Sequence, residues 1–348
     1  MGDKPLVKSR IVRRGVAGVT LLTVLLVITV LVSVGIGAEH TPFSVVAKII
    51  SSHIFGNPLS SNGAGGSDLM VQDTIIWQMR LPRVLLAAIV GILLAVAGAA
   101  LQGLLLNPLA DPYTVGVSSG AAFGAAIAFV LGLSGWLAGF GVPIVAFIFA
   151  LAAMLVVYSL SRFGGRVSIH SFLLAGVVVG SFLWAALTFV LTLAGQDLSV
   201  IIHWLLGSFA DKPWSYIVMI LPFAVIGLAV LVAIARDLNV YSLGEETARH
   251  LGVDIEKLKL IIIITTSLIT AAAVSVSGII GFAGLIVPHI ARRMFGSDHR
   301  VLLPTAALSG AILMVIADTA ARALGEVPVG VITAMLGAPF FLYLLRRG

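Results

Sequence analysis

The chain has 348 residues, of which 59% are hydrophobic and only 10% are charged. Soluble domains carry roughly 25% charged residues, so this composition excludes an ordinary soluble domain and indicates a protein embedded in a lipid bilayer. Cysteine is absent, which excludes disulfides, thiolate nucleophiles and Cys-ligated metals. The net charge of +6 does not indicate a nucleic-acid partner, because the basic residues lie between apolar runs, where they set membrane orientation.

The N-terminal end pairs a basic cluster, Lys4 to Arg14, with an unbroken apolar run over about 16–38. The apolar core of a cleavable signal peptide is usually about 7–15 residues long, whereas a spanning helix needs about 20. A retained first transmembrane helix is therefore favoured over a signal peptide.

Apolar runs of spanning length recur along the whole chain, separated by charges and by Pro/Gly clusters. They predict an all-α, polytopic membrane protein with one domain over 1–348 and ten transmembrane helices. The eighth run is interrupted by Pro288 and two arginines. The expected spans lie near 15–38, 82–106, 114–133, 138–161, 170–194, 214–235, 257–277, 280–297, 301–323 and 328–345.

The basic residues predict the orientation of these spans. With ten spans, sixteen of the 21 Lys and Arg residues fall on the side of the N-terminus and five on the other side. Cytoplasmic loops carry the excess of positive charge, so both termini are expected in the cytoplasm. The longest soluble segments are then an outer loop over about 39–80 and a cytoplasmic segment over about 236–256.

The stretch 107–112, NPLADP, breaks the apolar pattern and is expected to be a cytoplasmic turn between the second and third spans. Small residues at four-residue spacing let helix backbones approach closely in lipid. Glycines with this spacing follow in the third and fifth spans: Gly116, Gly120, Gly124, Gly176 and Gly180. Packing within the bundle is favoured, and a surface beside a translocation path is the alternative.

Polar residues inside the expected spans are few and include Gln102 and Asp318. Arg322 follows Asp318 by one helical turn, so a local ion pair is expected, although an intramembrane carboxylate can also mark a transport path. The spans contain no series of buried Asp, Glu and His residues that would relay protons.

The sequence contains no recognisable catalytic or cofactor motif. There is no G-x-x-x-x-G-K-[ST] loop to hold ATP phosphates and no H-E-x-x-H metal spacing, and the seven histidines are scattered. We therefore expect no cofactor, no metal and no catalytic residues, and we interpret the chain as a conduit rather than an enzyme.

The cytoplasmic segment has the features of a short helix. Ser242 and Glu245 match a capping box, which predicts a helix that starts at Ser242, and Gly252 is expected to end it. The apolar residues Leu243, Ala248 and Leu251 supply a modest stripe. The stripe indicates either a site for a cytosolic protein partner or a solvated connector.

Three arginines are expected at the outer face: Arg80 and Arg83 at the mouth of the second span, and Arg322 at the end of the ninth. They could form one patch for an acidic partner, because guanidinium groups bind carboxylates well. The alternative is that they extend to lipid headgroups. The loop before them is flexible by composition, with the stretch SSNGAGGSD over 60–68.

Five stretches, spread in order from the second span to the C-terminus, resemble the FecCD-type, or type II, ABC importer permeases, which include vitamin B12, haem and ferric-siderophore permeases. They are RLPRVLLAAIVG (80–91), AGAALQGLLLNPLADPYTVGVSSGA (97–121), LGEETARHLGV (243–253), SGIIGFAGLIVPHIAR (277–292) and VPVGVITAMLGAPFFLYLL (327–345). The first span, the outer loop and parts of the fourth and sixth spans match by hydropathy alone.

The resemblance implies a homodimer in the bacterial plasma (inner) membrane, two cytosolic ATP-binding subunits beneath it, and a periplasmic or lipid-anchored binding protein above it. It implies that Arg80, Arg83 and Arg322 dock the binding protein, and that a short helix within 196–211 helps to gate the path. It assigns ATPase coupling to Leu243, Gly244, Glu245, Glu246, Ala248, Arg249, Leu251, Gly252 and Val253.

The cargo is not defined by the sequence. The few polar groups in the spans suit a bulky chelate, so an iron chelate (siderophore or haem) and cobalamin all remain open. A stand-alone secondary transporter or channel is the alternative function, and it would require an ion or proton relay. A membrane scaffold without transport would need neither the coupling segment nor the glycine-lined spans.

Overall fold

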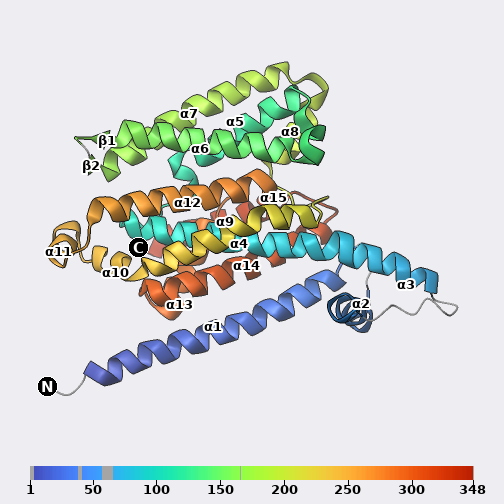
Figure 1. The fold of residues 1–348 in the computed structure, drawn as a ribbon, viewed down its shortest axis with the longest axis horizontal. Helices are drawn as coiled ribbons and strands as arrows, with labels where there is room; N and C mark the ends of the chain where they lie inside the picture. The colour runs from blue at the N-terminus through green and yellow to red at the C-terminus, as the bar shows by residue number, and fades with distance from the viewer. Residues whose placement is uncertain (1–3, 38–40, 57–65, 165, 348) are drawn as a thin grey trace.

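The computed structural model describes residues 4–37, 41–56, 66–164 and 166–347, and it is almost entirely helical (Figure 1). Its helices and strands are α1 Lys4–Gly35, α2 Phe43–Phe55, α3 Gly66–Asp73, η1 Thr74–Arg80, α4 Leu81–Leu104, η2 Pro112–Val115, α5 Val117–Val130, η3 Leu133–Gly139, α6 Gly141–Ser161, β1 Arg162–Phe163, β2 Arg166–Val167, α7 Ile169–Leu193, η4 Gly195–Asp197, α8 Leu198–Leu205, α9 Trp214–Ala233, α10 Ala235–Tyr241, α11 Glu245–His250, α12 Ile255–Ser277, α13 Ala283–Phe295, α14 His299–Ala323 and α15 Val329–Arg347.

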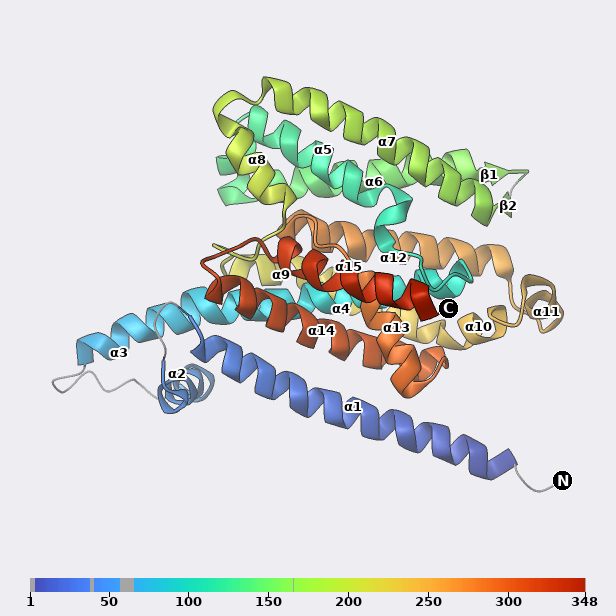
Figure 2. The same cartoon turned by 180° about the vertical axis from the view of Figure 1, so that it is seen from behind.

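Helix α4 lies at the centre of the bundle and contacts α9, α12, α13 and α14 (Figures 1 and 2). Its sequence is apolar on every side and 83% of its most apolar window is buried, as expected for a helix that has protein on all faces. The central helix therefore gives the other spans a common surface to pack against.

Two outer layers flank this centre. Helices α5, α6 and α7 form a layer beside α12, and α1 lies on the opposite side against α14 (Figure 1). The apolar windows of α1 and α7 are only 17% and 22% buried. Apolar surface that is left uncovered in this way is compatible with lipid or with a second membrane helix, but not with water.

The polytopic all-α prediction is confirmed, whereas the count of ten is not. Seven helices among the described residues are long and apolar enough to cross a membrane, and α5 with η3, bent by 100°, would make an eighth. The expected spans 280–297 and 328–345 correspond to α13, which has only 13 residues, and to α15, whose apolar described part is Val329–Tyr343. Length alone therefore leaves these two crossings undecided.

The expected outer loop over 39–80 is more helical than its composition predicts. It contains α2 and α3, and η1 continues directly into α4, so that one apolar helical run extends over Leu69–Leu104. The flexible stretch expected over 60–68 lies outside the described residues up to position 65, and its last three residues open α3.

The expected turn over 107–112 is confirmed. Helix α4 ends at Leu104, and the Asp111 carboxylate accepts the backbone N–H of Tyr113 at 2.8 Å, which caps η2. An aspartate in this position satisfies one of the backbone donors that a helix start leaves free.

Candidate functional site

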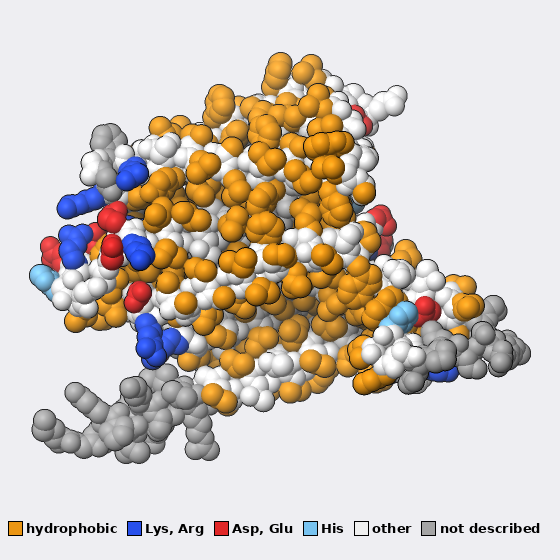
Figure 3. Space-filling model, in the orientation of Figure 1, with side chains coloured by type: hydrophobic (Ala, Val, Ile, Leu, Met, Phe, Trp, Pro, Cys, Tyr) orange, Lys and Arg blue, Asp and Glu red, His pale blue; other side chains and the backbone are white. Residues whose placement is uncertain are grey.

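Charged residues gather at the two ends of the molecule, and the face between the ends is largely hydrophobic (Figure 3). One end carries α10, α11 and the β1–β2 hairpin, and the start of α1 and the end of α15 lie toward it (Figure 2). The other end carries α2, η1 and the start of α4. A chemical function therefore has to be sought at these ends or along the path between them.

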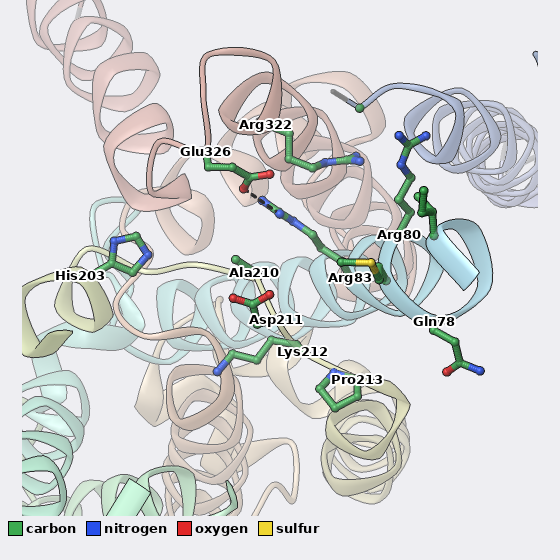
Figure 4. A pocket seen from close by; sticks show the side chains of 13 residues that line it. Gln78, Arg80, Arg83, His203, Ala210, Asp211, Lys212, Pro213, Arg322 and Glu326 are labelled. Atoms are coloured by element: carbon green, nitrogen blue, oxygen red, sulfur yellow. Dashed lines mark hydrogen bonds and ion pairs between the residues drawn. The ribbon is translucent and has the colours of Figure 1, made fainter. Parts of the chain in front are cut away.

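The three arginines expected at the outer face come together in one pocket. Arg80, Arg83 and Arg322 line a cavity of about 700 Å³ at the α2 end of the bundle (Figure 4). The same cavity is also lined by Gln78, His203, Asp211, Lys212 and Glu326. The pocket joins the start of α4, the end of α14 and the loop between α8 and α9.

Asp318 is the centre of an ion-pair cluster beneath this pocket. Arg83 Nε donates to Asp318 Oδ1 at 2.9 Å, and Arg322 Nε lies 3.2 Å from Asp318 Oδ2. The expected ion pair between Asp318 and Arg322 is thus confirmed, and Arg83 is a second partner. Arg83 Nη1 also donates to Glu326 Oε2 at 2.8 Å. The positive charges of Arg83 and Arg322 are therefore matched by the negative charges of Asp318 and Glu326.

The arginines are less exposed than a surface patch would be. Arg80 and Arg83 are each 9% exposed, and the Arg322 side chain is 5% exposed. Arg322 also donates to the carbonyl of Ile36 at 2.8 Å, and Arg80 donates to the carbonyl of Val34 at 3.2 Å. These bonds hold the end of α1 against α4 and α14, so a partner could reach the guanidinium groups only through the pocket.

Lys212 adds a titratable cation to the pocket wall. Burial lowers its pKa to about 8, and the neighbouring Asp211 carboxylate opposes that shift. Its ammonium lies 4.6 Å from the centre of the Tyr216 ring, a cation–π contact. The positive charge of the pocket is therefore expected to fall as the pH rises through 8.

At the opposite end, the expected coupling segment folds into α10 and α11. The predicted helix start at Ser242 is wrong, because Gly244 occupies the N-cap position of α11 and the Ser242 hydroxyl instead donates to the carbonyl of Asn239. Gly252 follows the end of α11 with a φ of +87°, as the sequence predicts for a terminating glycine.

The apolar stripe of this segment divides between two environments. Ala248 is fully buried, whereas Leu243 and Leu251 are 65% and 62% exposed. Arg249 pairs with Glu245 one turn away at 3.1 Å. Two exposed leucines, one on each side of a salt-bridged helix, give this end a small apolar surface.

The five glycines singled out in the third and fifth spans lie at helix contacts. A Cβ on Gly116 would meet the carbonyl oxygen of Gly176 at 3.6 Å and the nitrogen of Gly180 at 3.9 Å, so α7 lies close to the start of α5. On the next two turns, a Cβ on Gly120 or Gly124 would lie within 2.7 Å of Phe149 atoms in α6. These glycines allow close packing within one subunit.

Residues 25–347 match the FecCD transport family over nearly the whole chain. The chain belongs to the FecCD transport family. It is 43% identical to the cobalamin import system permease protein BtuC of Halobacterium salinarum, over 94% of this chain and 89% of that protein. It is 44% identical to the hemin transport system permease protein HmuU of Yersinia pestis, over 78% and 83%. It is also 43% identical to the uncharacterized ABC transporter permease protein YvrB of Bacillus subtilis, over 92% and 91%.

A solved structure shares the architecture of this FecCD-family chain. It is described as an inward-facing conformation of a metal-chelate type ABC transporter, and it superimposes with a TM-score of 0.80 at 32% identity, covering 95% of this chain and 99% of the other. The chain is therefore a multi-pass membrane permease subunit of an ABC importer, and ATP hydrolysis belongs to a separate subunit.

Several very close helix contacts among the described residues of this FecCD-family permease involve glycines that the sequence analysis did not single out. A Cβ on Gly98 in α4 would overlap the carbonyl oxygen of Gly284 in α13. A Cβ on Gly91 would overlap the carbonyl oxygen of Gly310 in α14, and the reverse also holds. Each glycine has its partner more than 180 positions away in the sequence, so spacing along one helix cannot reveal the pair.

Gln102, noted as an intramembrane polar residue, is satisfied within the subunit. Its amide nitrogen lies 3.3 Å from the carbonyl oxygens of Ala110 and Leu285, and its oxygen accepts from Arg292 at 3.1 Å. It ties α4 to the 107–112 turn and to α13. No group of three or more potential metal ligands occurs within the described part of the chain.

Replacing Gly244 by valine is expected to distort the start of α11. Gly244 has φ +110° and ψ 149°, a region that is essentially restricted to glycine, so a β-branched residue there costs about 1–3 kcal/mol. We expect the variant to co-purify with less than half of the normal amount of its ATPase subunit. Gly135→Val is the control, because Gly135 faces open space without a positive φ. Equal ATPase recovery in both variants would contradict the prediction.

Proposed function

We propose that two copies of this chain form a homodimer in the bacterial plasma (inner) membrane and import a metal chelate, either an iron chelate (siderophore or haem) or cobalamin. Each copy would contribute ten transmembrane helices, with α5, α13 and α15 as short crossings and both termini in the cytoplasm. The cobalamin and hemin permeases among the relatives, together with the metal-chelate type neighbour, support this cargo class.

One observation carries the proposal: the exposed segment 243–253 and an arginine-lined pocket lie at opposite ends of the same central helices. Helix α14 runs from His299, which hydrogen-bonds Asn239 of α10, to Arg322 in the pocket. A helix of 25 residues is about 37 Å long, which exceeds the hydrocarbon thickness of a bilayer. The two surfaces would therefore face opposite sides of the membrane.

At the cytoplasmic end, residues 243–253 would seat in the ATP-binding subunit. The exposed leucines Leu243 and Leu251 suit an apolar groove on that subunit, and Arg249 lies between them on the exposed helix. Two ATP-binding subunits, one beneath each copy, would provide the energy for transport.

At the outer end, a periplasmic or lipid-anchored binding protein would dock over the arginine pocket. A carboxylate from that protein could enter the cavity and compete with Glu326, which is 58% exposed, for Arg83. Buried guanidinium groups recognise a carboxylate more strongly than exposed ones, because they are less screened by salt.

The translocation path would run along the surface that includes α8 and α15. A groove of about 530 Å³ lies there, lined by Leu205 and Leu206, by Ile279 and Gly281 of the turn before α13, and by Met335 on α15. Short helix α8 lies within the segment that the family resemblance associates with gating. An apolar groove suits a bulky chelate that is delivered by a dedicated binding protein.

The decisive experiment is ATP-driven uptake into vesicles that hold the permease, its ATPase and its binding protein. Labelled ferric siderophore, haem and cobalamin are supplied separately, and uptake of one class is expected only with ATP and all three proteins present. A control without the ATPase tests the alternative, since uptake by the permease alone would identify a stand-alone transporter and overturn the proposal.

A further inference from the structure

We infer that Lys259 is the positioning residue that transmits movement of α11 to α12 and to the β1–β2 hairpin between α6 and α7. This inference rests on the proposed function of residues 243–253 as the ATPase contact. It concerns what happens behind that contact, within the permease.

Lys259 is buried, with 4% of its surface exposed, and its ammonium has three acceptors. The Nζ atom donates to Glu245 Oε2 at 3.1 Å, to the carbonyl oxygen of Val167 at 3.3 Å and to Glu256 Oε1 at 3.4 Å. An ammonium group has three N–H donors, so every donor can be used. A lysine this buried is rare unless its charge is paired, as it is here.

The three acceptors belong to three different parts of the fold. Glu245 is the first residue of α11, Glu256 lies on α12 one turn before Lys259, and Val167 is the last residue of β2. A second bond closes the cluster, because the backbone N–H of Val167 donates to Glu256 Oε2 at 2.9 Å. The hairpin, α11 and α12 thus share one set of hydrogen bonds.

This cluster connects the contact helix to both structural layers. The hairpin directly follows α6 and directly precedes α7, while α12 packs against α4, α6 and α9. A displacement of α11 would pull on Lys259 through Glu245. It would therefore move the end of α6 and the starts of α7 and α12 together. Without the ammonium group, α11 would keep few side-chain bonds to the rest of the bundle.

Lys259 itself is separate from the surface that a partner would touch, whereas its partner Glu245 belongs to residues 243–253. Lys259 lies beneath α11, whereas Leu243 and Leu251 are exposed. A substitution at Lys259 can therefore change transmission without removing the contact surface.

The test compares Lys259→Met with Lys257→Met in the complete complex. Lys257 is on the same helix, but it is exposed and has no ion pair among those found in the described residues. We expect Lys259→Met to retain the ATPase subunit and ATP hydrolysis, while chelate imported per ATP hydrolysed falls about tenfold, within the range of typical allosteric couplings. Lys257→Met should match the wild type.

Two further measurements keep the outcome clear if Lys259→Met is poorly folded. Glu256→Gln changes a partly exposed carboxylate of the same cluster that lies outside residues 243–253, and it should lower uptake per ATP in the same direction. Because the chain has no cysteine, spin labels can be attached to cysteines introduced at Glu246 and Arg166 in complexes in which only one of the two copies is labelled, and the distance between them should become broadly distributed in Lys259→Met.

The two proposals fail in different ways. If the wild-type complex shows no ATP-driven uptake, the proposed function is wrong. If the wild type imports its chelate but Lys259→Met and Glu256→Gln keep the normal uptake per ATP and a narrow label distance, the role of Lys259 is wrong.

Discussion

Replacing Asp318 by asparagine is expected to lower the free energy of unfolding by about 3 kcal/mol, roughly a 100-fold change in the ratio of folded to unfolded protein. Asp318 is fully buried and pairs with both Arg83 and Arg322. Asparagine keeps the shape of the side chain but removes the charge, so two largely buried guanidinium groups lose their shared counter-ion. Thermal unfolding of the detergent-solubilised permease, followed by tryptophan fluorescence, measures the loss.

Glu326→Gln is the matched control, because it removes the other carboxylate bound to Arg83. Glu326 is 58% exposed, so its pair is worth under about 1 kcal/mol. A second variant, Asp318→Leu with Arg322→Met, should recover much of the lost stability, since removing both members of a buried pair avoids the uncompensated charge. Equal stability of Asp318→Asn and Glu326→Gln would show that the cluster does not hold the outer end together.

The Asp318 cluster shows what the sequence can and cannot predict. Arg322 follows Asp318 by four residues, so helical periodicity alone identifies the pair. Arg83 is 235 positions away from Asp318, and only the packing of α4 on α14 brings the two together. The sequence also places all three arginines at the outer end, but it does not show that they are buried in a pocket.

At the end that carries α10 and α11, the sequence also predicts the local helix but not the long-range contacts. Composition and the LGEETARHLGV stretch indicate a short helix at residues 243–253, and α11 lies there. The capping-box pattern predicts a helix start at Ser242, but α11 begins after Gly244. Gly244 has a φ of +110°, which only glycine adopts readily, and the sequence pattern does not reveal this backbone conformation. The sequence identifies Lys259 only as one of the positive charges that predict the membrane orientation. Its bond to the carbonyl of Val167 cannot be predicted, because the two residues are 92 positions apart.

Hydropathy predicts the positions of the long and the short helices, but α5 and α13 are shorter than a standard span. Helices α4 and α12 each contain an uncharged, largely apolar stretch of spanning length, so a window of that size finds them. The 280–297 run contains Gly281 and begins with a turn in which Phe282 has a φ of +68°, so α13 starts only at Ala283. An apolar run can therefore be longer than the helix that it contains, because part of the run can form a turn inside the bundle.

Replacing Gly98 by alanine is expected to cost about 3 kcal/mol and to reduce the yield of monodisperse permease severalfold, at the upper end of the penalty for overpacking. A Cβ at this position would overlap the carbonyl oxygen of Gly284. That atom belongs to the backbone of α13, so no side-chain rotation can relieve the overlap, and α13 would have to move away from α4. Size-exclusion chromatography of a fluorescent fusion and thermal unfolding measure the effect.

The reciprocal substitution gives a graded control for the same contact. A Cβ on Gly284 would lie 2.7 Å from Pro112 Cδ and 2.9 Å from the carbonyl oxygen of Leu94, which is a milder conflict. Gly135→Ala faces open space and should have no effect. The expected order of damage is therefore Gly98→Ala, then Gly284→Ala, then Gly135→Ala. A Gly98→Ala protein as stable as Gly135→Ala would mean that α4 and α13 are not in backbone contact, and that the central position of α4 depends on its other neighbours.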